Sequence, residues 1–389
     1  MTLVALAAAL ALPSAGQKPV EVPFRIGEDA LIVDATVNGK QASFMFDTGF
    51  SGSVVLNEAI NIGKATGTMG LRDFVGTFTA KTVKITSLKL GDLAISSKDM
   101  EAVQQPLAHM TQSYNSHTDG IMGLQVIRDQ VTEINFEKKR FIFHPKTLDI
   151  TKRVPDNKKT FLMRMLPLGN NSIELEVVAS TGKKLVLALD TGNAFFATTH
   201  TDVLERVGLW QAGKAPQFMK SAWVASGPVA SWYKQMDDMK IFGVPVKKSY
   251  WSIIDLPSSS ADGDGTVGFG FLRNFNIIFD FERRRVWLEN WTGQVGNEMP
   301  AEVGIAAAHD EKIKRVRIYK VAPESPAAKA GIREGDQILA IDGQDLIAPT
   351  MRQVEKLLEG RLGSKVKLAI SRQGNLIRYE LERAQLVNP

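Results

Sequence analysis

Short runs of alternating apolar and polar residues cover most of the chain up to about residue 290, separated by Gly, Asn and Asp. Runs such as Thr82–Leu90 and Val286–Leu288 show the two-residue period of strands with one buried face. Helical periodicity is scarce before residue 320. The pattern therefore predicts that this long region is mainly β, with many short strands.

The last part of the chain mixes helical and strand patterns. Ser325 and Pro326 predict the N-cap and first turn of a short helix that ends at Gly331. Further elements are expected as a strand over Ile338–Ile341, a helix that starts after Thr350 and stops at Gly360, and a strand over Val366–Ile370. This region predicts a small α+β module of the size of an independent domain.

The β region contains an internal repeat. Leu31–Gly49 aligns without a gap with Glu174–Gly192, which begins 143 residues later. Each copy reads as an apolar strand, a turn that ends in Gly39 or Gly182, a second apolar strand, and then Asp-Thr-Gly. We expect two similar hairpins, each ending in the same three residues.

Two further blocks repeat at an offset of 145 residues. Asp119–Leu124 matches Asp264–Phe269 as Asp-Gly, two residues of which the second is apolar, Gly and an apolar residue. Phe136–Arg140 matches Phe281–Arg285, and each leads into a β-type run. The nearly constant offset predicts a duplicated unit that forms two similar all-β lobes.

Composition narrows the chemistry available to the chain. Its 389 residues predict two or three domains, and 47 basic against 42 acidic residues give a charge of +5 without a dense basic stripe. Nucleic acid is therefore not an expected partner. The absence of cysteine excludes disulfides, cysteine-ligated zinc, iron–sulfur clusters and a thiol nucleophile. The five histidines show no paired metal-ligand spacing, so neither metal nor cofactor is expected.

Asp47 and Asp190 occupy equivalent positions in the two repeats, each at the end of an apolar strand. If the repeats pack about a pseudo-twofold axis, the two loops meet on that axis. Two carboxylates about 3 Å apart share one proton, so one can act as base on a water while the other polarises a carbonyl. Either copy alone fits an ordinary turn; the matched pair indicates a site. The supporting residues are Thr48 and Thr191, which can tie the loops together, and Gly49 and Gly192, which permit close approach.

These blocks resemble the two lobes of a pepsin–retropepsin-type aspartic protease over about residues 25–290. The ends FEKKRFIFHP and FERRRVWLEN are similar to those of bacterial retropepsin-like proteins with both lobes in one chain. The resemblance implies an aspartic-type endopeptidase of acid-protease fold, with Asp47 and Asp190 catalytic. It also implies that Gly123 and Gly268 support the aspartate loops from behind.

The chain departs from the eukaryotic pepsin pattern directly after each Asp-Thr-Gly. Phe50 and Asn193 stand where the family has Ser or Thr. The departure concerns the fine tuning of the paired carboxyls.

The family closes a flap hairpin over its substrate, and distance from Asp47 places the candidate at 67–78. Its named residues are Gly67, Met69, Gly70 and, at the tip, Phe74. Gln217–Gly227 is the possible counterpart in the second lobe. Neither segment carries the Tyr of a pepsin-like flap, and a plain surface hairpin remains an alternative for both.

The C-terminal module resembles a bacterial PDZ domain through VAPESPAAKAGI, EGDQIL and IDG between residues 321 and 343. The resemblance implies that a loop of backbone N–H groups captures a peptide C-terminus, which adds as a strand to the sheet edge. The loop is expected at Val303, Gly304 and Ile305. The alternative is a strand start without a ligand.

Residues 3–12 read LVALAAALAL and are followed by small residues. The run is too short to span a bilayer but fits the apolar part of a signal peptide, although no basic residue precedes it. We expect an exported protein, periplasmic or secreted; a buried apolar N-terminal segment is the alternative. The expected division is a signal peptide at 1–16, two protease lobes at 17–150 and 151–297, and a PDZ domain at 298–389, with no stable membrane span.

The predicted function is a hydrolase that cleaves polypeptides, with a PDZ domain that binds peptide or protein C-termini. A second possibility is a non-enzymatic protein that keeps the protease fold as a peptide-binding scaffold; a third is proteolysis by a self-associated chain. Gly49–Ser53 nearly forms a serine nucleophile elbow, but its last residue is Ser instead of Gly. Gly268–Gly270 begins a dinucleotide fingerprint whose third Gly is replaced by Arg273.

Overall fold

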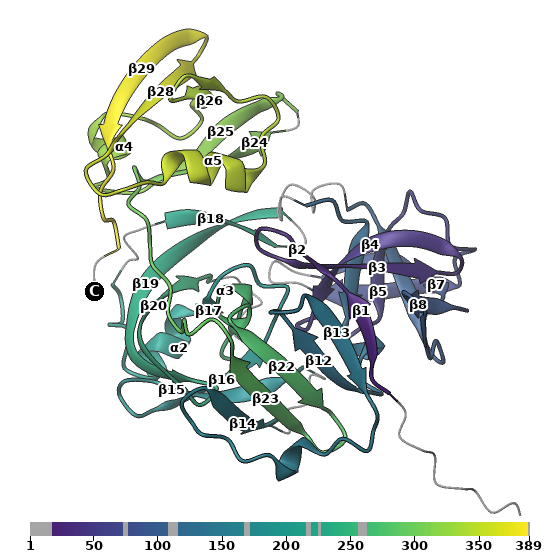
Figure 1. Ribbon diagram of the computed structural model, residues 1–389. Helices are drawn as coiled ribbons and strands as arrows, with labels where there is room; N and C mark the ends of the chain where they lie inside the picture. Colours follow the sequence, from purple (N-terminus) through teal and green to yellow (C-terminus); the bar gives the residue numbers. More distant parts are fainter. Residues whose placement is uncertain are drawn as a thin grey trace, which may run out of the picture.

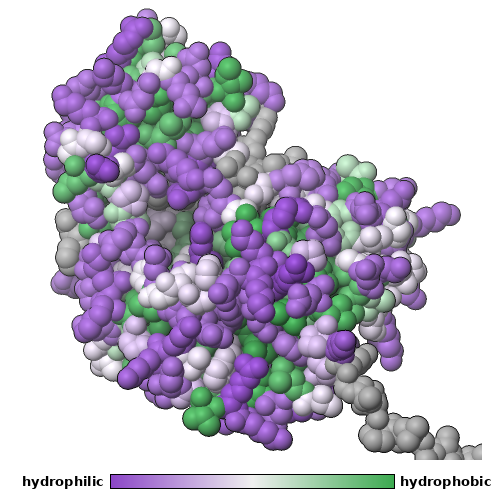
Figure 2. Space-filling model, in the orientation of Figure 1, coloured by the Kyte–Doolittle hydropathy of each residue, from purple (hydrophilic) through white to green (hydrophobic). Residues whose placement is uncertain are grey.

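The structure is a computed structural model of the 389-residue chain. It describes residues 18–72, 77–107, 116–166, 172–214, 219–224, 227–255, 263–310 and 312–387. The expected signal peptide and Phe74 lie outside the described residues. Two β-rich lobes form the larger body, and a smaller module sits against them (Figure 1). Hydrophilic residues cover most of the visible face, with small apolar groups between them (Figure 2).

The first lobe is built on a ten-stranded sheet whose main path runs β6-β7-β10-β5-β11-β4-β3-β8-β9, with β2 paired to β3. The strands are β2 (Arg25–Ile26), β3 (Leu31–Val37), β4 (Lys40–Asp47), β5 (Val54–Asn57), β6 (Gly67–Arg72), β7 (Thr77–Lys84), β8 (Leu88–Leu90), β9 (Leu93–Ile95), β10 (Glu101–Gln105) and β11 (Gly120–Gly123). A short 3-10 helix, η1 (Leu124–Val126), follows β11.

One expected run is interrupted in this lobe. Residues 82–90 alternate like a single strand, yet β7 ends at Lys84 and β8 starts at Leu88. The side chain of Asn38 accepts hydrogen bonds from the backbone N–H groups of Thr86 and Ser87 at 2.8 and 3.1 Å. A turn held from another hairpin therefore separates two strands that the alternation alone joins.

The second lobe has a seven-stranded sheet in the order β15-β16-β21-β17-β20-β19-β18. Its strands are β15 (Glu174–Val178), β16 (Lys184–Leu189), β17 (Ala197–Thr199), β18 (Met219–Val224), β19 (Gly227–Ile241), β20 (Val244–Ile253) and β21 (Thr266–Val267), with helices α2 (Thr201–Arg206) and α3 (Phe269–Leu272). The path β3-β4-β11-β5-β10-β7-β6 of the first lobe has the same order and strand directions as this sheet. The topology thus repeats as the sequence does.

A third sheet joins the lobes, in the order β1-β13-β12-β22-β23-β14. Its strands are β1 (Val20–Pro23), β12 (Val131–Asn135), β13 (Arg140–His144), β14 (Thr160–Arg164), β22 (Phe275–Asp280) and β23 (Arg285–Asn290). β12 and β22 come from different lobes and pair antiparallel at its centre. Phe136 and Phe269, also from different lobes, pack edge to face with ring centroids 5.8 Å apart. The lobes therefore share one hydrophobic core.

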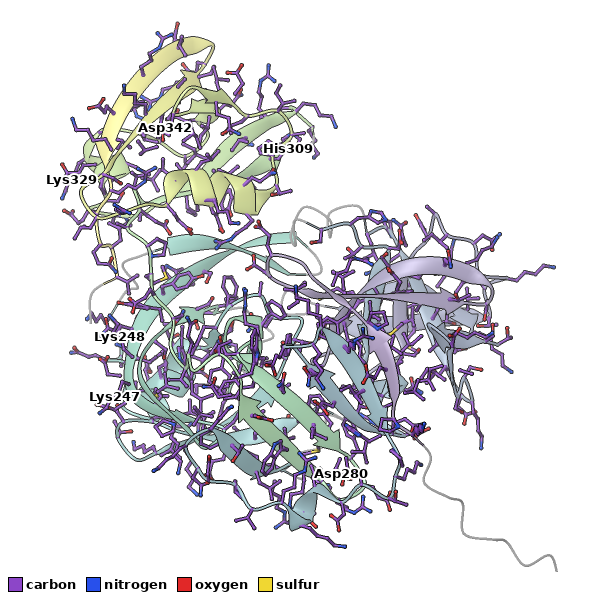
Figure 3. All side chains as sticks on the ribbon, viewed as in Figure 1. Lys247, Lys248, Asp280, His309, Lys329 and Asp342 are labelled. Atoms are coloured by element: carbon purple, nitrogen blue, oxygen red, sulfur yellow. The ribbon has the colours of Figure 1, made fainter. Side chains whose placement is uncertain are left out.

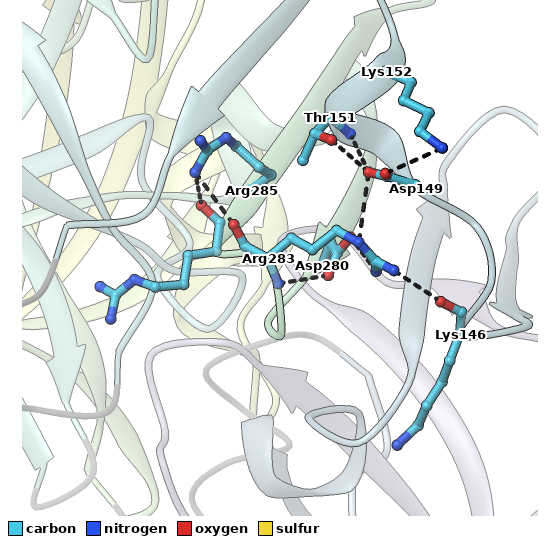
Figure 4. Close-up of polar contacts among 8 residues, drawn as sticks. Lys146, Asp149, Thr151, Lys152, Asp280, Arg283 and Arg285 are labelled. Carbon is cyan, nitrogen blue, oxygen red and sulfur yellow. Dashed lines mark hydrogen bonds and ion pairs between the residues drawn. The ribbon is translucent and has the colours of Figure 1, made fainter.

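Polar contacts fasten the end of the first lobe to the second (Figure 4). The Arg283 guanidinium donates to the buried carboxylate of Asp280 at 3.1 Å and lies 3.5 Å from Asp149. Asp149 caps η2 (Ile150–Lys152) by accepting from the Thr151 backbone N–H at 3.0 Å. The basic run at 283–285 thus includes a residue that bridges the lobes.

The C-terminal module is a six-stranded sheet with two helices. Its elements are β24 (Ile305–Asp310), β25 (Arg315–Val321), α4 (Pro326–Lys329), β26 (Gln337–Ile341), β27 (Gln344–Asp345), α5 (Met351–Leu358), β28 (Lys365–Arg372) and β29 (Asn375–Glu382). Both predicted helices form. Ser325 caps α4, and Thr350 forms a capping box with Gln353 at the start of α5.

Candidate active site

The two Asp-Thr-Gly loops meet between the lobes. Asp47 ends β4, and Asp190 directly follows β16. A Cβ atom added to Gly49 would lie 2.6 Å from Cγ of Asp190, and one added to Gly192 would lie 2.3 Å from Cγ of Asp47. Each glycine therefore faces the carboxyl group of the other lobe, and any larger residue would push the two carboxyl groups apart.

Two threonines lock the loops across the lobe boundary. The Thr48 hydroxyl donates to the Leu189 carbonyl at 2.7 Å and accepts from the Thr191 backbone N–H at 2.9 Å. The Thr191 hydroxyl donates to the Phe46 carbonyl at 2.7 Å and accepts from the Thr48 N–H at 3.1 Å. Both side chains are fully buried, so all four hydrogen bonds are shielded from water.

The paired carboxyls sit in unequal surroundings. Asp47 is partly exposed and accepts from the N–H groups of Gly49 and Phe50 at 2.7 and 3.1 Å. Asp190 is buried and accepts from those of Gly192 and Asn193 at 2.9 and 3.2 Å. Burial, the charge of Asp47 and a hydrogen bond with it raise the pKa of Asp190 well above its ordinary range. Burial also raises the pKa of Asp47, but hydrogen bonds oppose that shift.

Gly123 and Gly268 lie directly behind the aspartate loops. A Cβ on Gly123 would meet the carbonyl oxygens of Gly52 and Phe50 at 2.4 and 2.5 Å. A Cβ on Gly268 would meet the carbonyl oxygens of Phe195 and Asn193 at 2.2 and 2.6 Å. Because neither glycine has a side chain, the segment that contains it can pack directly against the backbone of the aspartate loop.

The residues that follow the two motifs differ in their contacts. Phe50 packs against an apolar cluster of the first lobe. Asn193 donates through Nδ2 to the hydroxyls of Thr198 and Thr266 at 2.9 and 2.6 Å. The first lobe thus holds its loop by apolar packing and the second by hydrogen bonds.

Both flap candidates form edge hairpins at equivalent positions. β6 pairs with β7, and β18 pairs with β19, at the same end of the corresponding sheets. Gly67 lies opposite Thr82, and Met69 is 41% exposed. Gly70 also lies on β6, with no atom near a Cβ added to it. The structure places these residues on a hairpin; closure over a substrate stays a prediction.

The predicted carboxylate loop of the C-terminal module precedes its edge strand. Gly304 has a φ of +81°, and an added Cβ would lie 2.3 Å from Cβ of Ser325. The carbonyls of Val303 and Gly304 accept from the N–H groups of Ala327 and Ala322 at 3.0 and 2.9 Å. Among the described residues, the Gly304 N–H donates no hydrogen bond. Ile305, the third residue of this loop, starts β24 and is buried.

Sequence reasoning missed two features around the site. Asp119 and Asp264 open the second repeated block, and each accepts a hydrogen bond from the backbone of the strand before the aspartate loop, from Ser43 at 2.8 Å and Val186 at 2.9 Å. Their matched positions were a usable signal. Phe195, five residues after Asp190, packs edge to face on Tyr233 of β19 at 6.0 Å. No periodic pattern in the sequence predicts that contact.

Comparisons with known proteins agree with the two-part organisation. Residues 33–126 match the family described as aspartyl protease, and residues 317–372 match the family described as PDZ domain. The chain therefore carries an aspartyl protease domain in its N-terminal part and a PDZ domain in its C-terminal part, as the sequence predicted. The mainly β fold class is likewise confirmed.

Curated relatives match only part of the chain. It is similar to a probable CtpA-like serine protease of Staphylococcus haemolyticus, with 34% identity over 84 residues that cover 22% of this chain and 17% of that protein. It is also similar to the periplasmic serine endoprotease DegP of Salmonella typhimurium, with 30% identity over 131 residues that cover 32% and 27%. The chain thus spans less than a third of the length of these relatives.

Two solved structures extend the comparison. An aspartic proteinase from Irpex lacteus is matched at 13% identity over 70% of this chain and 98% of that chain, with a TM-score of 0.44. A photosystem II D1 C-terminal processing protease is matched at 32% identity over 23% of this chain and 24% of that chain, with a TM-score of 0.22.

Within the described residues, no helix has the length and apolarity to cross a bilayer.

Proposed function

We propose that this chain is an aspartic endopeptidase. The observation that supports it most strongly is the direct approach of the Asp47 and Asp190 carboxyls, each facing the glycine of the opposite loop. In this proposal Asp190 carries the shared proton and gives it to the carbonyl oxygen of the scissile bond. Ionised Asp47 takes a proton from the water that attacks the carbonyl carbon, and later delivers it to the leaving amine.

The surrounding residues position these groups. Thr48 and Thr191 fix the distance between the loops, and Gly123 and Gly268 support them from behind. The hairpins β6–β7 and β18–β19 act as flaps over an extended polypeptide. Rigid positioning of this kind supports the reaction because the reacting groups need no reorganisation when the substrate arrives.

The aspartic type is favoured over the serine type that the names of the curated relatives suggest. Those relatives share only part of this chain, and neither is matched over a third of its own length. The near nucleophile elbow at Gly49–Ser53 lacks its last glycine: Ser53 stands in that place, is buried and donates its hydroxyl hydrogen to the Glu101 carbonyl at 2.5 Å. The carboxyl groups of Asp47 and Asp190, in contrast, are oriented by hydrogen bonds from backbone N–H groups.

The remaining parts of the proposal concern organisation and location. The PDZ domain binds the C-termini of peptides or proteins, with Val303, Gly304 and Ile305 around the carboxylate. The protease lobes span 17–150 and 151–297, and the PDZ part spans 298–389. Export to the periplasm or beyond is supported by the apolar run at 3–12 and by the name of the periplasmic relative.

The proposal is tested with a mixed peptide library between about pH 3 and 8, analysed by mass spectrometry. Asp47→Asn and Asp190→Asn should each lower hydrolysis by about 10²- to 10⁴-fold, because each removes one half of the acid–base pair. The double variant should be no worse than either single one. Circular dichroism checks that the variants fold. Near-normal turnover by either single variant, or loss of activity in a chelator, contradicts the proposal.

A further inference from the structure

The edge strand of the PDZ domain is covered on the side that faces away from its own core. β24 pairs only with β25 among the described strands. Ile305 and Ala307 point into the domain's core. Ala306 and Ala308 alternate with them and point the other way, yet they are only 2% and 8% exposed. Something outside the PDZ core therefore covers this strand.

Two elements lie close to β24: α5 of the PDZ domain itself, and β18 of the second-lobe hairpin that corresponds to the first flap candidate. β18 and β24 belong to separate sheets but approach each other across the boundary between the second lobe and the PDZ domain. β18 is the last strand of the second-lobe sheet, and β24 is the first of the PDZ sheet. Two sheet edges thus face each other across the boundary between the protease and the PDZ domain. His309, near the end of β24, is also buried (Figure 3).

The same strand is where a peptide has to bind. PDZ domains add a peptide as a strand to a sheet edge, with its carboxylate at a loop of N–H groups. The Gly304 loop leads directly into β24, and α5 lies beside β24 as the opposite wall. The contact with β18 therefore occupies the edge that a peptide requires.

The PDZ domain also grips the first lobe through α5. Lys356 lies 2.6 Å from Glu28, and Arg352 lies 3.6 Å from Asp29. Glu28 and Asp29 stand between β2 and β3, just before the end of β3 that pairs with the last residues of β4. The two walls of the peptide groove are therefore held by different lobes, β24 by the second and α5 by the first.

A line of side chains connects this boundary with the aspartate loop of the second lobe. Tyr250, Ala322 and Val387 form a buried cluster between the second lobe and the PDZ domain, and Tyr233 packs against it. Tyr233 lies on β19, the second strand of the β18–β19 hairpin. Its ring also contacts that of Phe195, in the loop after Asp190. A displacement of the hairpin therefore reaches the active site through a single intervening ring pair.

We propose that β18 and a peptide C-terminus compete for β24, so that ligand binding at the PDZ domain releases the second-lobe hairpin and changes access to the Asp47–Asp190 pair. The contact in the structure is then the ligand-free, latched state. A ligand that binds only the released state shifts the population toward it. The consequence for hydrolysis rests on the proposed function, whereas the competition itself does not.

The competition is tested by binding to full-length Asp47→Asn protein, which avoids cleavage of the probe. The probe is a fluorescein-labelled pool of random heptapeptides with a free C-terminal carboxylate, and its amidated twin is the negative control. Because the chain has no cysteine, Glu28→Cys with Lys356→Cys can be joined selectively by a disulfide-containing bis-maleimide. The crosslink should weaken binding at least tenfold, and reduction of the linker should restore it.

A matched crosslink controls for the chemistry. Lys365 and Glu380 form an ion pair of the same 2.6 Å length inside the PDZ sheet, and Lys365→Cys joined to Glu380→Cys should leave binding unchanged. In the opposite direction, Glu28→Gln with Asp29→Asn loosens the grip of the first lobe and should tighten binding by up to about fivefold. Equal affinity with and without the first crosslink, or no binding by any form, overturns the competition.

Hydrolysis provides the second readout. The free-carboxylate pool is added to the wild-type chain while it cleaves a short reporter peptide with an amidated C-terminus. The proposal expects kcat/KM for the reporter to change when the pool is present and to stay constant with the amidated pool. An unchanged kcat/KM beside a positive competition result rejects the coupling to the active site. If the reporter is not cleaved at all, the proposed function fails while the binding result still decides the competition.

Discussion

The two lobes share one strand order but use it differently. In both, a hairpin ends in Asp-Thr-Gly, a second block lies behind the loop, and an edge hairpin stands at the same end of the sheet. The first-lobe hairpin β6–β7 remains an edge, whereas the second-lobe β18 lies against the PDZ domain. The duplicated sequence therefore gives both lobes the same strand order, whereas the substitutions after the motifs and the docked PDZ domain make the two lobes different.

The inequality extends to the carboxyls themselves. Asp190 is buried beside an asparagine that donates two hydrogen bonds, whereas Asp47 is partly exposed beside Phe50. The pKa of Asp190 is raised the more strongly of the two. In the proposed mechanism, two chemically identical groups in equivalent loops thus take different tasks, Asp190 as proton donor and Asp47 as base.

Both lobes share the glycine of the Asp-Thr-Gly motif, which faces the carboxyl group of the opposite lobe. Gly49→Ala and Gly192→Ala should each lower kcat/KM by about 10²-fold, because the added methyl group must displace the carboxyl of the opposite lobe. Steady-state kinetics measure the loss, and crystal structures of the variants show the displacement. Activity within twofold of wild type in either variant contradicts the close approach of the loops.

The pH dependence of stability sharpens the difference between the carboxyls. The raised pKa of Asp190 means that the native protein holds a proton that the unfolded chain, with its ordinary pKa of 3.8, releases. Between those two pKa values the native state binds more protons, so stability falls as pH rises. Asp190→Asn has no proton to lose. Its melting temperature should therefore match wild type near about pH 3 and exceed it increasingly at higher pH.

The same experiment compares the lobes directly. Asp47→Asn should show a smaller gain, because the hydrogen bond between the two carboxyl groups lowers the pKa of Asp47 but raises that of Asp190. The exposed Glu58→Gln serves as a control for removal of a negative charge. Equal gains for the two aspartates, measured by scanning calorimetry from about pH 3 to 8, contradict the assigned inequality.

The smallest expected effect concerns the residues that follow the motifs. Asn193→Ala removes the two hydrogen bonds to Thr198 and Thr266 and should lower the free energy of unfolding by about 1–3 kcal/mol, since the buried Thr198 hydroxyl and the half-buried Thr266 hydroxyl each lose a partner. Urea titration measures that loss. Phe50→Leu, which keeps an apolar side chain, is the matched change in the first lobe and should lower the free energy of unfolding less than Asn193→Ala does in the same titration.

Much of this architecture is legible in the sequence because duplication leaves a signal. Two matched Asp-Thr-Gly motifs predicted the meeting of Asp47 and Asp190, and the caps at Ser325 and Thr350 predicted both helices of the PDZ domain. Local residue chemistry determines the helix caps, and the repeated motif indicates the pairing of the two loops. The catalytic assignment itself stays a prediction, as do the flap residues and the carboxylate loop.

Other features depend on contacts between distant segments and leave no local pattern. The central pairing of β12 with β22 is invisible from either strand alone, because both read as ordinary apolar runs. The meeting of β18 with β24 and the pairing of Lys356 with Glu28 depend on how whole domains pack. The alternation of residues 82–90 predicts one strand. The turn that divides it into β7 and β8 is not predicted, because it is held by Asn38, which lies far away in sequence.

The shared sheet also sets an order of events during synthesis. β12 is complete long before its neighbour β22 leaves the ribosome, so the first half of the protein waits with an unpaired strand edge. Such an edge attracts other chains, and a pairing between distant segments forms slowly. The first lobe therefore completes its sheet only after the second lobe has been synthesised. The two lobes fold together as one unit instead of one after the other.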